Sequence, residues 1–252
     1  MTRKFIAILI TVALMIIVGS GIHVQNTYAL QKQKEQTIKE FFTPIGSFMK
    51  ENKNYLSQSI SSLRADNLKV EEIIARVNAW PITMGELEFR RGLRDISGLG
   101  SSEYTDVFNV LVEEKIIIDY SLKNGILPSK EQIQELIERE KGWYQDSNGQ
   151  YKETVDAILR ASNMTLNEYW TTYEWYNAFR LLAFDNTYKF VIKNGQKQGK
   201  LPSGENGITE EMIKQYETYW NNHKKSLKAK AEVKMLDDKG LNLELDLEKL
   251  FL

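Results

Sequence analysis

Helix-start signals recur along this sequence, and they constrain its fold more than any other feature. In three places a Ser or Thr stands three residues before a Glu or Gln, so that each side chain can bond the other residue's backbone N–H in the first turn of a helix. These pairs are Thr83 with Glu86, Ser129 with Gln132, and Thr165 with Glu168. A fourth start, Thr209, is followed by Glu210 and Glu211, whose negative charge suits a helix N-terminus. The signals predict a mainly helical body.

Helix ends and the centre of the core can also be predicted. Residues 104–123 form the most apolar stretch of the body and end at Asn124-Gly125, where glycine can take the left-handed capping conformation. We expect this helix to lie at the centre of the core. By the same argument, the aromatic helix that begins at Thr165 should end at Asn194-Gly195.

Short strands are expected near each end of the body. Residues 73–77 form a short extended run that stops at the turn signal Asn78-Ala79-Trp80-Pro81. Residues 229–236 and 241–247 partly alternate between apolar and polar, and they flank Asp237-Asp238-Lys239-Gly240. This pattern predicts a C-terminal hairpin. The predicted fold class is therefore mainly α, with an N-terminal strand and a C-terminal hairpin.

The first 29 residues are typical of an export signal. Arg3 and Lys4 precede an uncharged apolar run, residues 5–18, which is the layout of a secretory leader. Counted to Val24, the run reaches the roughly 20 residues of a membrane-spanning helix and predicts an uncleaved anchor. Thr27-Tyr28-Ala29 could instead be a cleavage site, and the protein would then be secreted. In both cases the body lies outside the cytoplasmic membrane, because the positive residues stay inside.

Composition excludes several kinds of chemistry. The chain of 252 residues has no cysteine, which excludes disulfides, thiolate metal sites and a cysteine nucleophile. With two histidines, a multi-histidine metal site is nearly excluded as well. A formal net charge of −1 gives no electrostatic footprint for nucleic acid. We therefore expect no cofactor, no metal and no nucleic-acid partner.

The acid, base and nucleophile candidates do not converge. Glu113-Glu114 and the pair Glu138 and Glu140 are too close in a helix to face one cleft, and we expect them on a solvated face. His223 has no second histidine near it in the sequence and no aligned serine, so we expect it at the surface. These observations predict that the protein is not an enzyme.

The order of the pieces resembles a known family. A strand, a turn, a helix start and two apolar helices follow one another with spacings similar to those in the N-terminal chaperone domain of SurA and of the PrsA-type extracytoplasmic foldases. The resemblance covers residues 72–236. The matching residues are Val77, Asn78, Pro81, Ile82, Thr83, Glu86, Leu87, Glu88, Val110 to Ile118, Lys123 to Ile126, Ser129, Ile133 and Ile137.

The resemblance implies a chaperone domain without its usual enzyme. In the family a parvulin prolyl isomerase domain follows, and Lys234 stands where that domain's first histidine is expected. We therefore expect no isomerase activity, and we expect the terminal strand to pair back to residues 73–77. PrsA-type proteins are held by lipid on a cysteine, which this chain lacks, so residues 5–24 would supply the attachment. Ala79 departs from the family's usual glycine.

Together these observations predict four segments. They are a signal peptide or anchor at 1–29, a helical membrane-proximal segment at 30–71, the SurA-N-like domain at 72–236 and a hairpin tail at 237–252. The expected function is a membrane-anchored, non-enzymatic chaperone that binds unfolded or newly secreted polypeptides. The alternative is an envelope assembly protein that holds one dedicated partner. No oligomeric state is predicted.

The aromatic helices offer candidates for peptide binding. Residues 165–195 and 209–228 carry more aromatic side chains than one buried stripe accommodates, so we expect most in the core and some at a client surface. The peptide-binding candidates are Trp170, Trp175, Tyr176 and Trp220. Nearby lysines form a basic patch, which is either a solvated helix end or a surface for anionic lipid; its members are Lys224, Lys225, Lys228 and Lys230.

Overall fold

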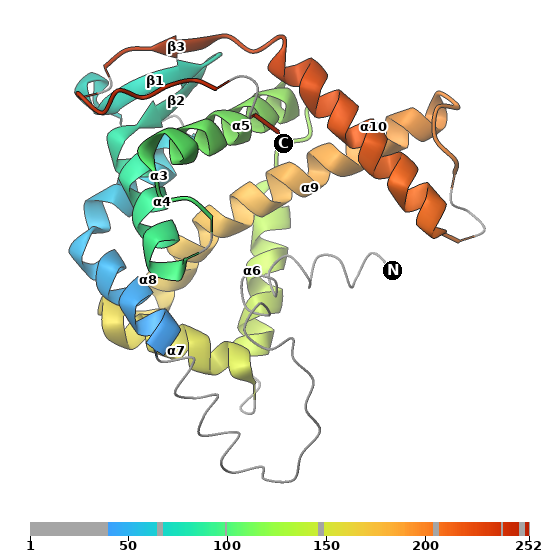
Figure 1. Ribbon diagram of the computed structural model, residues 1–252. Coiled ribbons are helices and arrows are strands. Elements are labelled where there is room, and N and C mark those ends of the chain that lie inside the picture. Colours follow the sequence, from blue (N-terminus) through green and yellow to red (C-terminus); the bar gives the residue numbers. More distant parts are fainter. Residues whose placement is uncertain are drawn as a thin grey trace. The chain divides into compact units, whose positions relative to one another are not determined.

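The computed structural model describes residues 40–64, 68–98, 100–145, 149–203, 207–237, 239–246 and 250–251. The predicted leader at 1–29 lies outside these residues. Over the described ranges the chain is mainly helical with a small antiparallel sheet (Figure 1), as the sequence predicts.

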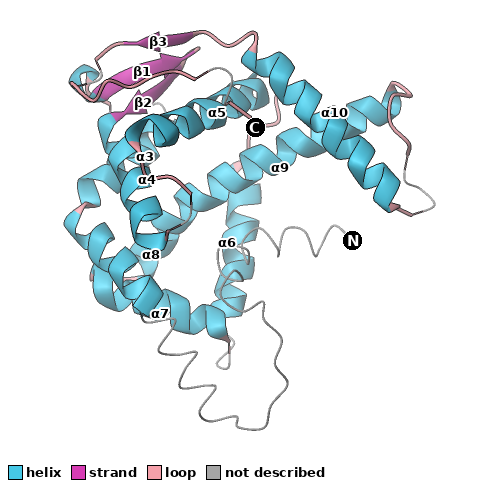
Figure 2. Cartoon of the chain, in the orientation of Figure 1, coloured by secondary structure: helices cyan, strands magenta, loops and turns pink. Residues whose placement is uncertain are grey.

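The helices follow one another with short connections (Figure 2). Residues 40–51 are helical and pass through Pro44 without a break. The helices that follow are α3 (Lys53–Arg64), α4 (Met84–Ser97), α5 (Tyr104–Lys123), α6 (Lys130–Gln145), α7 (Gln150–Ser162), α8 (Leu166–Thr171), α9 (Tyr173–Lys197) and α10 (Glu210–Lys228). Helix α3 buries Leu56, Ile60 and Leu63 and packs against α4 and the sheet. Part of the segment predicted to be membrane-proximal therefore belongs to the folded core.

The predicted helix starts are confirmed. The Thr83 hydroxyl accepts from the Glu86 N–H at 3.1 Å, and α4 begins at the next residue. Ser129 with Gln132, and Thr165 with Glu168, form the reciprocal pairs that the spacing predicts. Thr209 caps α10 by accepting from the N–H of Met212. Local side-chain chemistry thus sets the beginning of four helices.

The predicted end of the aromatic helix is wrong. The helix breaks at Thr172, which separates α8 from α9, and α9 continues through Gly195 to Lys197. A Cβ at position 195 would come within 2.8 Å of Leu201 Cδ1, so glycine there permits close packing inside the helix. The left-handed glycine after the helix is Gly199, with φ 69°.

The sheet has the order β2, β1, β3, all antiparallel. Strand β1 (Ile73–Val77) confirms the predicted N-terminal strand, and β3 (Val233–Met235) pairs with it as the family resemblance implies. Strand β2 (Trp80–Thr83) begins inside the predicted turn, because the turn needs only Asn78, at φ 52°, and Ala79. The sheet therefore joins residues more than 150 positions apart.

The predicted C-terminal hairpin is wrong. Residues 239–246 form no strand, and β3 is at the edge of the described sheet. Residues 241–246 instead lie on α5, where their backbone bonds to helix side chains and Leu243 is buried. The alternation of apolar and polar residues reflects a half-buried segment that packs on a helix, and the left-handed Asn242, with φ 51°, interrupts its extended backbone.

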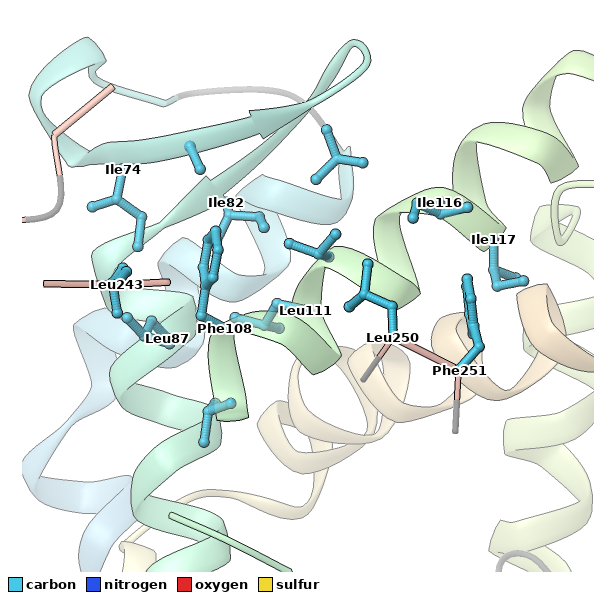
Figure 3. Packing of buried hydrophobic residues seen from close by; sticks show 14 of the residues in the cluster. Ile74, Ile82, Leu87, Phe108, Leu111, Ile116, Ile117, Leu243, Leu250 and Phe251 are labelled. Atoms are coloured by element: carbon cyan, nitrogen blue, oxygen red, sulfur yellow. The ribbon is translucent and has the colours of Figure 1, made fainter. Parts of the chain in front are cut away.

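Helix α5 lies at the centre of the core, as predicted. Its apolar residues join those of the sheet, α4, α9 and α10 in one buried cluster (Figure 3). A buried ion pair lies beside α5: Lys115 Nζ is 2.9 Å from Glu86 Oε1, and both side chains are fully buried. The Ser62 hydroxyl accepts from Lys115 and lies 2.6 Å from the second Glu86 oxygen. These bonds satisfy both charges, which would otherwise be costly to bury.

Candidate functional site

The four aromatic candidates for peptide binding are largely packed inside the protein. Trp170, Tyr176 and Trp220 are buried, and their rings contact other aromatic rings of the core. These three side chains contribute to stability and cannot contact a client without local opening. Six of the twelve aromatic side chains on residues 165–195 and 209–228 are buried, and three of the four candidates are among them.

Trp175 is the one candidate that is only half-buried, and its ring is also engaged. The guanidinium of Arg64 lies 4.1 Å from the ring centroid, and the ring stacks on Phe179. A cation over the ring face occupies the surface that an incoming apolar side chain would need. The structure therefore does not bring the four residues together as one open surface.

A stripe of polar side chains on α5 bonds to the backbone of a later part of the chain. Thr105, Asn109 and Glu113 are spaced by four residues, so they form one stripe along the helix. The stripe contacts residues 239–246 and 250–251, here called the docked segment. Asn109 Nδ2 donates to the Glu244 carbonyl at 3.1 Å, and Asn109 Oδ1 accepts from the Asp246 N–H at 3.0 Å. One side-chain amide thus holds both a donor and an acceptor of the segment's backbone.

The other members of the stripe also bond to the segment's backbone. The Glu244 N–H donates to Thr105 Oγ1 at 3.5 Å, and the Phe251 N–H donates to the Glu113 carboxylate. From α10, Lys228 Nζ donates to the carbonyl of Leu250 at 3.3 Å. All five hydrogen bonds therefore reach main-chain atoms, which every polypeptide offers.

The apolar side chains of the docked segment enter the core. Leu243, Leu250 and Phe251 are buried in the cluster that contains Phe108 and Ile116 (Figure 3). Leu241 and Leu245 pack against the same cluster and are partly buried. Between them Asn242 and Glu244 are exposed. The site thus combines main-chain hydrogen bonds with apolar contacts along an irregular segment. Asn242 is left-handed, with φ 51°, and the Leu250 N–H donates to the Asp246 carbonyl in a turn.

Charge around this site is partly desolvated. Burial raises the pKa of Glu113, while the Phe251 N–H and the Lys224 ammonium act in the opposite direction. Burial lowers the pKa of Lys224, whose ammonium lies 5.6 Å from the centroid of the Phe251 ring. Lys224 and Lys228 thus belong to the site on α5, and the basic patch is not simply a solvated helix end.

Sequence reasoning missed this site, although a signal for it exists. Three polar residues at four-residue spacing interrupt an otherwise apolar face of residues 104–123. Such a stripe at the centre of a core has to find polar partners. Helical periodicity alone does not show which part of the chain supplies them.

The expectation of a solvated face for Glu113-Glu114 is wrong, although the two side chains do diverge. Glu114 bonds to the guanidinium groups of Arg90 and Arg180, on a different side of α5 from the docked segment. Burial alone would raise its pKa, but Arg180 and Arg90 hold the pKa of Glu114 well below its usual range. Arg90 also donates to the Tyr176 hydroxyl at 3.4 Å. This cluster ties α4, α5 and α9 together.

Glu140 also departs from the expected solvated face. Glu138 is exposed and pairs with Lys141, but Glu140 is 1% exposed and lies close to the buried Glu174. Among the described residues, neither carboxylate oxygen of Glu140 has a hydrogen-bond donor. Burial, reinforced by the charge of Glu174, raises the pKa of Glu140 to about 10. Glu140 is therefore protonated at neutral pH and can share its proton with Glu174.

His223 is not a surface residue as expected. Its ring is half-buried, stacks on Trp220 and meets Tyr120 edge to face with centroids 5.0 Å apart. Burial lowers the pKa of His223, with the positive charge of Lys230 acting in the same direction. His223 is thus a packing residue of α10.

The described residues contain no group of three or more His, Asp or Glu side chains placed to hold a metal ion. Within the same ranges, none of the helices combines the length and the apolar character required to cross a membrane. No protein-family model, no curated protein and no solved structure matches this chain.

Proposed function

We propose that this chain is an exported, membrane-associated, non-enzymatic chaperone that binds unfolded or newly secreted polypeptides. The observation that carries the proposal is the antiparallel pairing of β1 with β3, since the resemblance to the SurA and PrsA chaperone domains implies that contact. One strand pairing supports a function only together with a site of suitable chemistry.

The chemistry of α5 supplies that second support. Its polar stripe bonds to main-chain atoms of the docked segment, and the adjacent core accepts apolar side chains. Unfolded polypeptides share these two features whatever their sequence. A site that binds main-chain groups and apolar side chains is suited to holding many clients.

The test is an aggregation assay with the purified full chain. Chemically denatured serum albumin, reduced and carboxymethylated so that it cannot refold, is the client. We expect binding in the micromolar range, because disordered clients lose conformational entropy when they are ordered. We also expect slower aggregation of a diluted, denatured reporter enzyme. If neither effect occurs, the chaperone proposal fails.

A proline-peptide assay addresses the expected lack of isomerase activity. Lys234 lies in β3, where it pairs with Arg76 in the sheet. Catalysis above background by the full chain would contradict the non-enzymatic part of the proposal. Quantified pull-down from an envelope fraction separates many clients from one dedicated partner.

A further inference from the structure

We propose that the α5 face formed by Thr105, Asn109, Glu113 and the adjoining apolar cluster is the client-binding site. We infer further that the docked segment is its intramolecular occupant. This inference rests on the proposed chaperone function and names the site and its regulation. Its client is an extended polypeptide with apolar side chains and a free main-chain edge.

The first argument is that the site forms hydrogen bonds with main-chain atoms and not with particular side chains. Asn109 bonds to the carbonyl of Glu244 and to the N–H of Asp246, which are two residues apart. Residues two apart in an extended chain present their main-chain groups on the same edge. Asn109 therefore recognises one repeat of an extended backbone, and any extended polypeptide can offer the same repeat.

The second argument concerns polar groups that the site would leave without partners. Asn109 is buried, and its side-chain amide also donates to the Thr105 carbonyl at 2.8 Å. With the docked segment in place, both amide hydrogens and the oxygen have partners. Without it, one donor and one acceptor would face an apolar surface. Such a surface binds any segment that offers both main-chain groups and apolar side chains.

The third argument is that the docked segment is held under backbone strain. Lys239 and Phe251 have φ values of 55° and 63°, in the left-handed region that disfavours side chains other than those of glycine and asparagine. The segment is not part of the described sheet. A client without these constraints avoids that strain, which favours exchange between segment and client.

Two chain variants test exchange in the full chain. Leu243→Ala with Phe251→Ala weakens the apolar contacts of the segment and leaves the α5 stripe intact. The probes are a fluorescent peptide with the sequence of residues 239–252 and carboxymethylated serum albumin. We expect both probes to bind at least tenfold more tightly to this variant than to the unmodified chain. Adding Asn109→Ala should reverse most of the gain.

A disulfide lock gives the opposite change, because it ties the docked segment to α5. The chain has no cysteine, so Thr105→Cys with Glu244→Cys introduces a single pair, at positions where Thr105 Oγ1 lies 3.5 Å from the Glu244 nitrogen. Both forms carry the same substitutions, including the loss of the Thr105 hydroxyl, so the oxidised chain is compared with its own reduced form. We expect the oxidised chain to bind both probes at least tenfold more weakly than the reduced chain. Equal binding by the oxidised and reduced forms overturns the inference, and this readout stands even if the alanine variant unfolds.

The outcomes separate this inference from the proposed function. If serum albumin binds equally to the unmodified, weakened and locked chains, the chaperone function stands and the inference fails. If the peptide binds and responds to the lock but serum albumin does not bind, the site exists and the chaperone function fails. A dimer that dissociates when Phe251 is replaced would show that the segment comes from a second copy, which overturns intramolecular occupation.

Discussion

Two runs near the end of the chain, β3 and residues 241–246, are held in different ways. Strand β3 is held by main-chain bonds to β1, such as the Leu236 N–H to the Ile74 carbonyl at 2.9 Å. Residues 241–246 are held by side chains of a helix, chiefly Asn109. In the first case two strands supply one another's partners and become part of one sheet. In the second, the helix keeps its own main-chain bonds and offers side chains that another polypeptide can use.

The comparison teaches which part of the fold is exchangeable. Losing β3 would leave the main-chain groups of β1 without partners beside a buried core, which couples the strand to global stability. Losing the docked segment would expose an apolar face and one amide, which a client can cover. We therefore expect the two runs to open by different routes, β3 through global unfolding and the docked segment through local opening.

The largest expected effect lies in the sheet. Ile74 is fully buried in β1, and Ile74→Ala should lower the free energy of unfolding by about 3 to 4 kcal/mol, through lost apolar contact and a cavity. Denaturant titration followed by circular dichroism measures the change.

The matched change in the docked segment is Leu243→Ala. Leu243 is also buried, but we expect a loss below about 2 kcal/mol, because local opening limits what the native state can lose. Equal losses in the free energy of unfolding for Ile74→Ala and Leu243→Ala would show that the docked segment is as fixed as the sheet. The proposed difference between the two runs would then be wrong.

The second effect uses Glu140 to separate global from local opening. The raised pKa of Glu140, about 10, means that the folded chain keeps a proton that the unfolded chain releases above about pH 4.5. Its stabilising contribution is complete below that pH and is lost as pH rises towards 10. The glutamine side chain in the Glu140→Gln variant cannot titrate, so this loss should disappear. The free energy of unfolding of the variant minus that of the unmodified chain should therefore rise by about 2 to 3 kcal/mol between pH 6 and pH 8.

Amide hydrogen exchange then measures the opening of β3 and the opening of the docked segment separately. At pH 8 the Leu236 amide should exchange more slowly in Glu140→Gln, because it opens with the whole domain. The Asp246 amide should be unchanged if it opens locally. Slowing of both amides to the same extent would mean that they open together.

The third effect comes from the main-chain hydrogen bond between the Leu236 N–H, just after β3, and the Ile74 carbonyl of β1. Leu236→Pro removes one of the two N–H groups that donate to the Ile74 carbonyl, the other being that of Asp237 at 3.2 Å. We expect a loss of about 1 kcal/mol with faster exchange across β1. Leu236→Ala is the control, because it keeps the N–H and shortens a side chain that is largely exposed. If alanine costs as much as proline, side-chain packing rather than the ladder holds this strand.

How much the sequence could predict follows from how local each interaction is. Thr83, Ser129 and Thr165 cap helices through bonds to residues three positions away. The spacing in the sequence was therefore sufficient to predict where these helices begin. Glu86 looks like the return partner of Thr83, but its carboxylate bonds to Lys115 and Ser62, which are distant in sequence. The same limit applies to Gly195, whose role depends on Leu201 and Tyr219 packing beside it.

The candidate site was beyond sequence reasoning for the same reason. Alternation in residues 241–247 identifies an extended, half-buried segment but not the surface that buries it. A hairpin and a segment docked on α5 require the same pattern. Glu140 shows the limit for charge, because the spacing of Glu138 and Glu140 places them on different sides of α6 without showing which side is covered.

The smallest expected effect tests directly the hydrogen bonds between the Asn109 side chain and the docked segment. Asn109→Ala removes the donor to Glu244 and the acceptor for Asp246, but both main-chain groups can then reach water when the segment loosens. We therefore expect a loss of about 1 kcal/mol in global stability or less, with clearly faster exchange at the Asp246 amide. Asn109→Asp is the informative control, since a carboxylate can still accept from Asp246 but cannot donate to the Glu244 carbonyl. That carboxylate would also stand against the Thr105 and Glu244 carbonyls, to which Asn109 Nδ2 donates at 2.8 and 3.1 Å. At neutral pH we therefore expect exchange at Asp246 to be at least as fast in the aspartate variant as in the alanine variant. If alanine lowers global stability as much as Ile74→Ala does, Asn109 is a fixed part of the core, and residues 241–246 are not exchangeable.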